Sequence, residues 1–202
     1  MKRLLVCLLL VGVVGCGTSP SPEPPLAQNE SPKPPPVDTD VEKAGTELNK
    51  GVDFAAREDW AAAVADYTEA IRIDPDDADA YYNRGEAYFY LEEYDKLISD
   101  CTEAIRIKPD YAEAYDTRGL AYRLKGESDK AIADYTEAIR IKPDLALAYN
   151  NRGNAYDELG QYDKAISDYS EAIRLDPENV VGYYLRGITY YAQDEYDKAI
   201  SD

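Results

Sequence analysis

Histidine is absent from this chain of 202 residues, and lysine plus arginine number 22 against 40 aspartate plus glutamate residues. The commonest general base and the commonest metal ligand are therefore missing. The formal net charge of −18 opposes binding to nucleic acid, because phosphates need a basic surface. It also opposes electrostatic docking on anionic lipid. We therefore expect no nucleic-acid partner.

Cysteine is nearly as scarce, since Cys7, Cys16 and Cys101 are the whole set. Three thiols are too few for a four-cysteine zinc site or for a disulfide framework. The acidic string from Asp74 to Asp79 lacks the glycine and the final glutamate of a calcium loop. No pair of carboxylates is set apart from those of the other repeats described below, so we expect no catalytic residue, no metal and no cofactor.

Proline and tyrosine divide the chain into three segments. Eight of the twelve prolines lie between residues 20 and 36, and the other four recur 34 residues apart from Pro75 onward. All nineteen tyrosines lie at or after Tyr67. The segments are residues 1–15, 16–43 and 44–202.

Residues 1–15 have the pattern of a secretory signal peptide. Lys2 and Arg3 precede an apolar run that is too short for a spanning helix of ~20 residues. The run ends Val-Val-Gly-Cys at Cys16 and resembles the bacterial lipobox. The resemblance implies lipidation of Cys16 and an anchor in a bacterial cell envelope, on the outer membrane facing the periplasm if the cell has two membranes. The alternative is an ordinary signal peptide with an incidental cysteine.

Residues 16–43 would then be the lipidated cysteine followed by a linker. Proline, serine and acidic residues dominate this segment, and it cannot bury enough apolar surface to offset the entropy of ordering. We expect a disordered, partly polyproline tether that holds the next segment off the membrane. The alternative is a recognition site, because Pro-Lys-Pro-Pro-Pro at 32–36 suits an aromatic groove.

Residues 44–202 repeat with a period of 34 and without insertions. Ala-Tyr-Tyr-Asn-Arg-Gly at 80–85 returns as Ala-Tyr-Asp-Thr-Arg-Gly at 114–119 and as Ala-Tyr-Asn-Asn-Arg-Gly at 148–153. Apolar residues at helical spacing predict two helices in each copy, separated by a short turn. One helix pair cannot bury both of its faces, so neighbouring copies must stack.

The fourth copy carries the pattern of a known family. It reads Tyr149, Arg152-Gly153, Tyr156, Ala165, Tyr169, Ala172 and Pro177, and on these positions the segment resembles the tetratricopeptide repeat (TPR) family. The resemblance implies an all-α fold, a right-handed α-solenoid of about five helix-turn-helix repeats. The repeats would be residues 44–77, 78–111, 112–145, 146–179 and 180–202, the last one incomplete.

Some positions depart from the family pattern. Arginine replaces leucine beside the glycine in repeats two to five, and we expect these arginines to pair structurally with Asp100, Asp134 and Asp168. The second copy has Leu97 and Cys101 where the others have alanine and tyrosine, so Cys101 is predicted to be a buried structural thiol. In the fourth copy Asp163 is the predicted N-cap of the second helix. The arginines are Arg84, Arg118, Arg152 and Arg186.

The family resemblance also implies a binding scaffold whose concave face is lined by the first helix of each repeat. Aromatic side chains there serve as low-entropy anchors, and asparagine can bond a peptide backbone through both amide atoms. The expected partner is a protein or peptide segment. The groove residues that the resemblance assigns are Tyr82, Asn83, Glu86, Phe89, Asp116, Leu120, Arg123, Asn150, Asn154, Asp157, Tyr184, Ile188 and Tyr191.

One TPR subtype clamps a terminal carboxylate with lysine, asparagine and arginine. The matching positions here are Leu48, Val52, Asn83, Glu113 and Thr117, and only Asn83 fits. A chaperone-tail clamp is therefore not expected. Acidic charge on most copies predicts that a purely acidic ligand is repelled and that a basic one is favoured.

We expect a membrane-anchored, non-enzymatic interaction scaffold in envelope assembly or regulation. Two alternatives stay open. The incomplete last copy leaves an apolar face, so the chain could be a self-associating scaffold that joins through its C-terminal end. It could also be the N-terminal fragment of a larger TPR protein.

Overall fold

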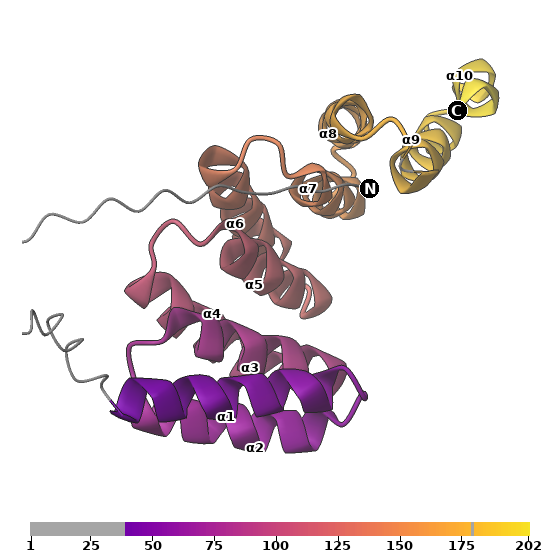
Figure 1. Cartoon of the computed structure of the whole chain (residues 1–202). Helices are drawn as coiled ribbons and strands as arrows, with labels where there is room; N and C mark the ends of the chain where they lie inside the picture. The colour runs from indigo at the N-terminus through magenta and orange to yellow at the C-terminus, as the bar shows by residue number, and fades with distance from the viewer. Residues whose placement is uncertain (1–38, 179) are drawn as a thin grey trace, which may run out of the picture. The chain divides into compact units, whose positions relative to one another are not determined.

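The structure, a computed structural model, describes residues 39–178 and 180–202. Within these residues ten helices follow one another and no strand occurs (Figure 1). The all-α repeat fold is therefore confirmed, whereas the signal peptide, Cys16 and the linker up to residue 38 lie outside the described residues. The helices are α1 (Thr39–Ala55), α2 (Trp60–Ile73), α3 (Ala78–Tyr90), α4 (Tyr94–Ile107), α5 (Ala112–Leu124), α6 (Ser128–Ile141), α7 (Ala146–Glu158), α8 (Tyr162–Leu175), α9 (Val180–Ala192) and α10 (Tyr196–Ser201).

The structure differs from the sequence prediction at the start of α1. Residues 39–43, which composition assigned to the linker, are helical. No proline falls among them, and Asp40 and Glu42 lie in the first turn of the helix. Carboxylates are favourable there because they face the positive end of the helix dipole. The acidic composition that suggested a linker is therefore also that of a helix N-terminus.

Each pair of helices is joined by the same turn. Its key residue has a positive φ and recurs with the repeat period, as glycine at Gly126 and Gly160 and as other residues at Glu58, Glu92 and Asp194. The following residue closes the first helix, as when the N–H of Gln161 donates to the Tyr156 carbonyl at 2.8 Å. This left-handed closure is a common helix C-terminus, and it turns the chain back on itself.

The second helix does not begin as expected in the fourth repeat. Gln161 occupies the N-cap of α8, no side chain caps it, and Asp163 lies in the first turn. The prediction for Asp163 was therefore wrong by two residues. Capping by aspartate occurs elsewhere, because the Asp59 carboxylate accepts the N–H of Ala62 at 3.2 Å and Asp77 caps α3.

The two helices of a repeat approach closely at a glycine. Gly153 faces the ring of Tyr169, and a methyl group built on Gly153 would lie 2.6 Å from that ring. In the second repeat Cys101 and Leu97 are both fully buried, so the larger leucine offsets the smaller cysteine. The prediction of a buried Cys101 is confirmed, and burial raises the pKa of its thiol.

The arginine and aspartate columns form a ladder of ion pairs. Nε and Nη2 of Arg84 donate to the Asp100 carboxylate, both at 2.7 Å, and Nη1 donates to Oγ1 of Thr68 at 3.1 Å. Each arginine thus joins the second helix of its own repeat to the second helix of the preceding one, and the predicted pairing is confirmed. The other sets are Arg118 with Asp134 and Thr102, Arg152 with Asp168 and Thr136, and Arg186 with Asp202 and Ser170.

The first helices of the repeats, which carry odd numbers, form the closer side of the stack. Within the described residues α1 contacts α3, α3 contacts α5, α5 contacts α7 and α7 contacts α9. No two even-numbered helices of that part of the chain have such a contact. The stack therefore bends toward the odd-numbered helices, and residues exposed on them share one face.

Candidate functional site

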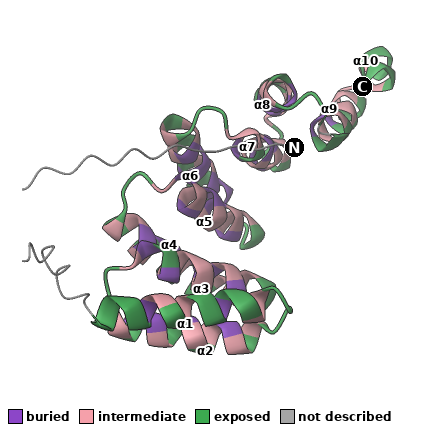
Figure 2. Ribbon diagram, viewed as in Figure 1, coloured by how far each residue is buried: buried purple, intermediate pink, exposed green. Residues whose placement is uncertain are grey.

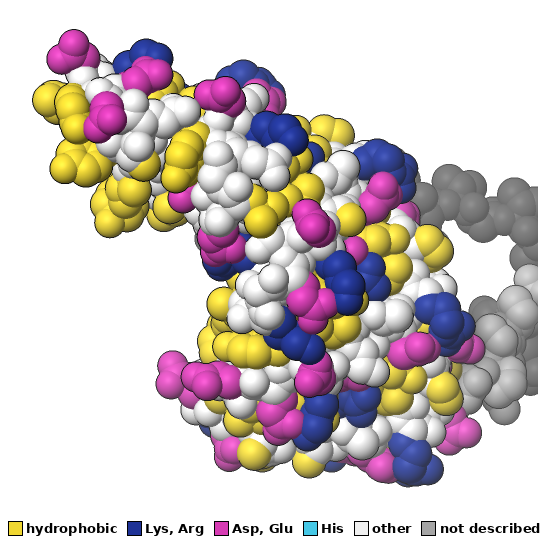
Figure 3. Space-filling view, turned by 180° about the vertical axis from the view of Figure 1, so that it is seen from behind, with side chains coloured by type: hydrophobic (Ala, Val, Ile, Leu, Met, Phe, Trp, Pro, Cys, Tyr) yellow, Lys and Arg dark blue, Asp and Glu magenta, His cyan; other side chains and the backbone are white. Residues whose placement is uncertain are grey.

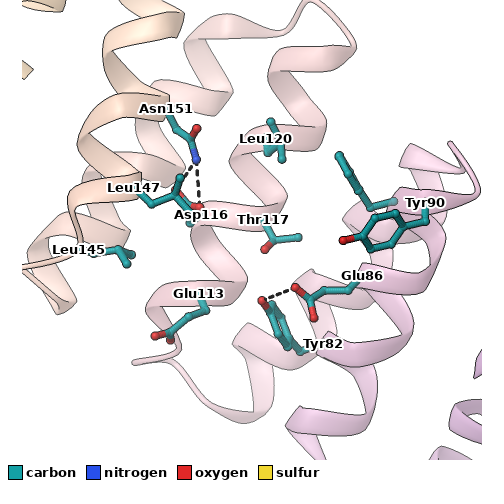
Figure 4. A pocket seen from close by; sticks show the side chains of 11 residues that line it. Tyr82, Glu86, Tyr90, Glu113, Asp116, Thr117, Leu120, Leu145, Leu147 and Asn151 are labelled. Carbon is teal, nitrogen blue, oxygen red and sulfur yellow. Dashed lines mark hydrogen bonds between the residues drawn. The ribbon is translucent and has the colours of Figure 1, made fainter. Parts of the chain in front are cut away.

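A pocket of about 270 Å³ opens on the face formed by α3, α5 and α7 (Figure 4). Its walls come from the first helices of three consecutive repeats, so it exists only because those repeats stack. Three of its eleven lining residues are acidic, and none is lysine or arginine. The apolar lining is Phe89, Tyr90, Leu120, Leu145 and Leu147, and the polar lining is Tyr82, Glu86, Glu113, Asp116, Thr117 and Asn151.

Two hydrogen bonds fix polar side chains in this pocket (Figure 4). The Tyr82 hydroxyl donates to Oε1 of Glu86 at 2.8 Å. The Asn151 amide donates to both carboxylate oxygens of Asp116 at 3.1 Å. The first bond holds the Glu86 carboxylate at the pocket, and the second ties α7 to α5.

The three carboxylates of the pocket differ in their electrostatics. Asp116 is only 6% exposed, and burial raises its pKa to about 6, although the bond from Asn151 opposes this shift. Glu113 pairs with Lys142 at 2.9 Å, and that hydrogen bond lowers the pKa of Glu113. With no cation in its lining, the pocket is negatively charged at neutral pH.

The structure brings together five of the predicted groove residues. Tyr82, Glu86, Phe89, Asp116 and Leu120 line this pocket. Asn83 is half-buried on α3 and does not line the pocket. Three further residues lie on a separate surface of α9, namely Tyr184, Ile188 and Tyr191.

The other four predicted groove residues contact neighbouring helices. Arg123 donates to Glu158 at 2.6 Å, and Asp157 accepts the Thr189 hydroxyl at 2.8 Å. These contacts join first helices of adjacent repeats. Likewise Asn154 accepts the Tyr169 hydroxyl at 2.9 Å, and Asn150 is buried beside α9. These four side chains are therefore engaged in the described structure, and their role in binding stays a prediction.

Sequence reasoning missed six residues of the pocket: Tyr90, Glu113, Thr117, Leu145, Leu147 and Asn151. Two of them had a visible signal. Thr117 and Asn151 occupy the same repeat position as Asn83, which was assigned to the groove. Leu147 is 56% exposed in the first turn of α7, but its exposure could not be known without the fold.

Two other kinds of site were sought in the same residues. No helix of residues 39–178 and 180–202 is both long and apolar enough to cross a membrane. No group of three or more histidine, cysteine, aspartate or glutamate side chains in that part of the chain is placed to hold a metal ion.

Comparison with known families supplies independent information. Models of the tetratricopeptide repeat match residues 146–179 and 169–201, and a model of the TPR repeat matches residues 51–99 and 119–160. Together the matches extend over more than half of the chain. Among curated proteins no match was found.

Several solved structures are similar. A crystal structure of MamA is 26% identical, with a TM-score of 0.70, over 75% of this chain and 88% of that chain. YrrB, described as a TPR protein with an unusual peptide-binding site, is 21% identical, with a TM-score of 0.66, over 81% and 86%. The first TPR of Spaghetti (RPAP3), bound to the HSP90 peptide SRMEEVD, is 27% identical, with a TM-score of 0.59, over 59% and 95%.

Proposed function

Since the chain belongs to the tetratricopeptide repeat family, we propose that it is a non-enzymatic scaffold that binds a segment of another protein. The proposed site is the pocket of α3, α5 and α7. The observation that carries this proposal is the lining itself, in which apolar and acidic side chains from three repeats meet without a cation. The solved relatives YrrB and RPAP3 are described with peptide sites, which supports the same class of ligand.

The lining also favours one chemistry in the ligand. Phe89, Tyr90 and Leu120 offer apolar surface to an aliphatic or aromatic side chain. Glu86 and Asp116 favour lysine or arginine beside that side chain, because opposite charges attract and a like charge is repelled. The peptide bound by RPAP3 is acidic instead, and this pocket lacks the cations that such a peptide needs. We therefore expect a segment with an apolar residue flanked by basic ones.

A pair of peptide arrays tests this function. Both carry the same central leucine or phenylalanine, flanked by lysines in one array and by glutamates in the other, and affinity for the full chain is measured by fluorescence anisotropy. Lysine-flanked peptides should bind roughly tenfold tighter or better, which corresponds to about 1.4 kcal/mol. Equal binding of the two arrays, or preference for glutamate, would refute the assignment.

A matched pair of variants locates the site. Leu120→Ala removes apolar surface from the pocket, whereas Leu124→Ala changes a residue of the same helix that does not line it. Loss of one buried leucine side chain should weaken binding by roughly 1–3 kcal/mol. Leu124→Ala should bind as the unaltered chain does. Identical affinities of the two variants would place the ligand elsewhere.

We further propose that Cys16 anchors this scaffold in a bacterial envelope membrane, where it would organise or regulate envelope proteins. The basic start, the short apolar run and Gly15-Cys16 support lipidation. Labelling with a palmitate analogue should be lost in Cys16→Ser and kept in Cys7→Ser, which alters the cysteine inside the apolar run. Label that persists in Cys16→Ser would refute the anchor.

A further inference from the structure

The last two helices expose a cluster of apolar side chains. Seven of the fourteen large apolar residues that are exposed in the described part of the chain lie on α9 and α10. Figure 3 shows apolar side chains gathered at the upper left, over the end of the stack that carries these helices. Six of them surround a hollow of about 590 Å³ and are called here the C-terminal face: Val180, Tyr184, Ile188, Tyr191, Tyr196 and Ile200.

The repeat geometry indicates that this face is built to be covered. Tyr184 occupies the repeat position of Asp116 and Asn150. Those two residues are 6% and 3% exposed because the next first helix packs over them, whereas Tyr184 is 66% exposed. Helix α10 has no buried residue at all (Figure 2). The face therefore presents the surface that each inner repeat offers to its neighbour.

The chemistry of the face also differs from that of the inner interfaces. Inner repeats meet partly through polar pairs such as Asn151 with Asp116, but the C-terminal face carries tyrosine and isoleucine at the exposed positions. The one charged residue that lines its hollow is Asp202, and Arg186 binds that carboxylate at 2.5 and 2.8 Å. The face thus bears no net charge, although the chain as a whole has −18.

The opposite end of the stack is a poor match for it. In α3 the positions that pack on α2 are Ala80 and Ala87, both buried. The same repeat positions of α1 hold Thr46 and Asp53, and both are exposed. Docking the C-terminal face against α1 of another copy would bury the Asp53 carboxylate against apolar side chains, which is unfavourable. Head-to-tail association is therefore disfavoured.

We propose that two copies of this chain associate through their C-terminal faces, related by a two-fold axis. A two-fold interface pairs each patch with itself, so an uncharged aromatic and aliphatic patch suits it. The six side chains expose on the order of 600 Å² per copy when scaled from the ~150–250 Å² of a whole aromatic side chain. Two such faces reach the ~1,200 Å² at which stable interfaces begin.

Cysteine crosslinking of the full chain in membranes tests the proposal. Single cysteines are placed at Tyr184, Ile188 or Tyr191, and a thiol oxidant is added before separation under non-reducing conditions. At least one of the three should convert most of the chain to a disulfide-linked dimer. Leu124→Cys is the matched control, because Leu124 and Ile188 are similarly exposed, at 43% and 47%, and it should give no more dimer than the unaltered chain.

Further variants separate the remaining outcomes. Ile188→Glu added to the cysteine variant that crosslinks should abolish its dimer, while Leu124→Glu should leave it unchanged. A ladder of multimers that needs both Thr46→Cys and Ile188→Cys would show head-to-tail stacking and overturn the proposal. Crosslinking only to a chain of another size, or no crosslink from any of the three positions, would also overturn it. Each result is independent of peptide binding in the pocket of α3, α5 and α7.

Discussion

Replacing glycine by alanine at equivalent positions of two repeats should change stability in opposite directions. Gly153 lies in α7 and Gly85 lies at the same position of α3. A methyl group on Gly153 would lie 2.6, 2.9 and 3.1 Å from three ring carbons of Tyr169. On Gly85 it would meet Sγ of Cys101 at 3.4 Å, which is an ordinary contact. The two sites differ mainly in the residue that faces the glycine.

The magnitudes follow from two opposing effects. Alanine within a helix is favoured over glycine by about 0.5–1 kcal/mol, because glycine loses more conformational entropy on folding. Overpacking a well-filled interior has a penalty of typically 1–3 kcal/mol. Gly85→Ala should therefore raise the free energy of unfolding by about 0.5–1 kcal/mol. Gly153→Ala should lower it by about 1–2 kcal/mol, since its ring cannot retreat from the buried interface.

Thermal unfolding followed by circular dichroism measures both variants. For a chain of this size each kcal/mol corresponds to roughly 2–4 °C in Tm. A double variant checks the cause, because Gly153→Ala combined with Tyr169→Cys removes the clash and the two changes should not be additive. If Gly85→Ala and Gly153→Ala shifted Tm in the same direction, the account of glycine facing tyrosine would be refuted.

Three other residues give predictions of the same kind. Because burial raises the pKa of Asp116 to about 6, above its unfolded value, stability should fall as pH rises from about 4 to 6, by roughly 2–3 kcal/mol. Asp116→Asn should remove that dependence in urea titrations at both pH values, and an unchanged difference would contradict it. Asp134→Ala leaves Arg118 half-buried without its carboxylate and should cost about 3 kcal/mol, whereas Glu137→Ala, which breaks an exposed pair, should cost under about 1 kcal/mol. Glu92→Gly relieves a positive φ and should raise Tm, while Glu93→Gly should not; equal shifts would argue against strain at that turn.

Much of the fold could be predicted because the period repeats its own evidence. Each glycine, tyrosine, arginine and aspartate column was visible several times over, so the close approach at Gly153 and the pairing of Arg152 with Asp168 followed from spacing. Helix boundaries were less secure. Asp163 was expected to cap α8, but the turn before it closes on Gln161, and no pattern in the sequence fixes that turn length.

The pocket could be predicted only in part. Asp116 and Asp157 occupy exposed-looking positions of first helices, yet each meets a side chain 32 to 35 residues away. A repeat period says that such residues are neighbours. It does not say whether Asp116 bonds Asn151 or points to a ligand, because that choice depends on side-chain rotamers. The sequence therefore predicted the face but not which of its residues remain free to bind.

The arginine ladder has a consequence for how stiff the repeat array is. Second helices do not touch one another in the described residues, so guanidinium groups such as Arg84, reaching from Thr68 to Asp100, act as the ties along that side. Flexing the array to open or shut the opposite side would stretch every tie at once. A visiting peptide would thus meet a mould that is already set, and little of its binding energy would be spent on reshaping the host.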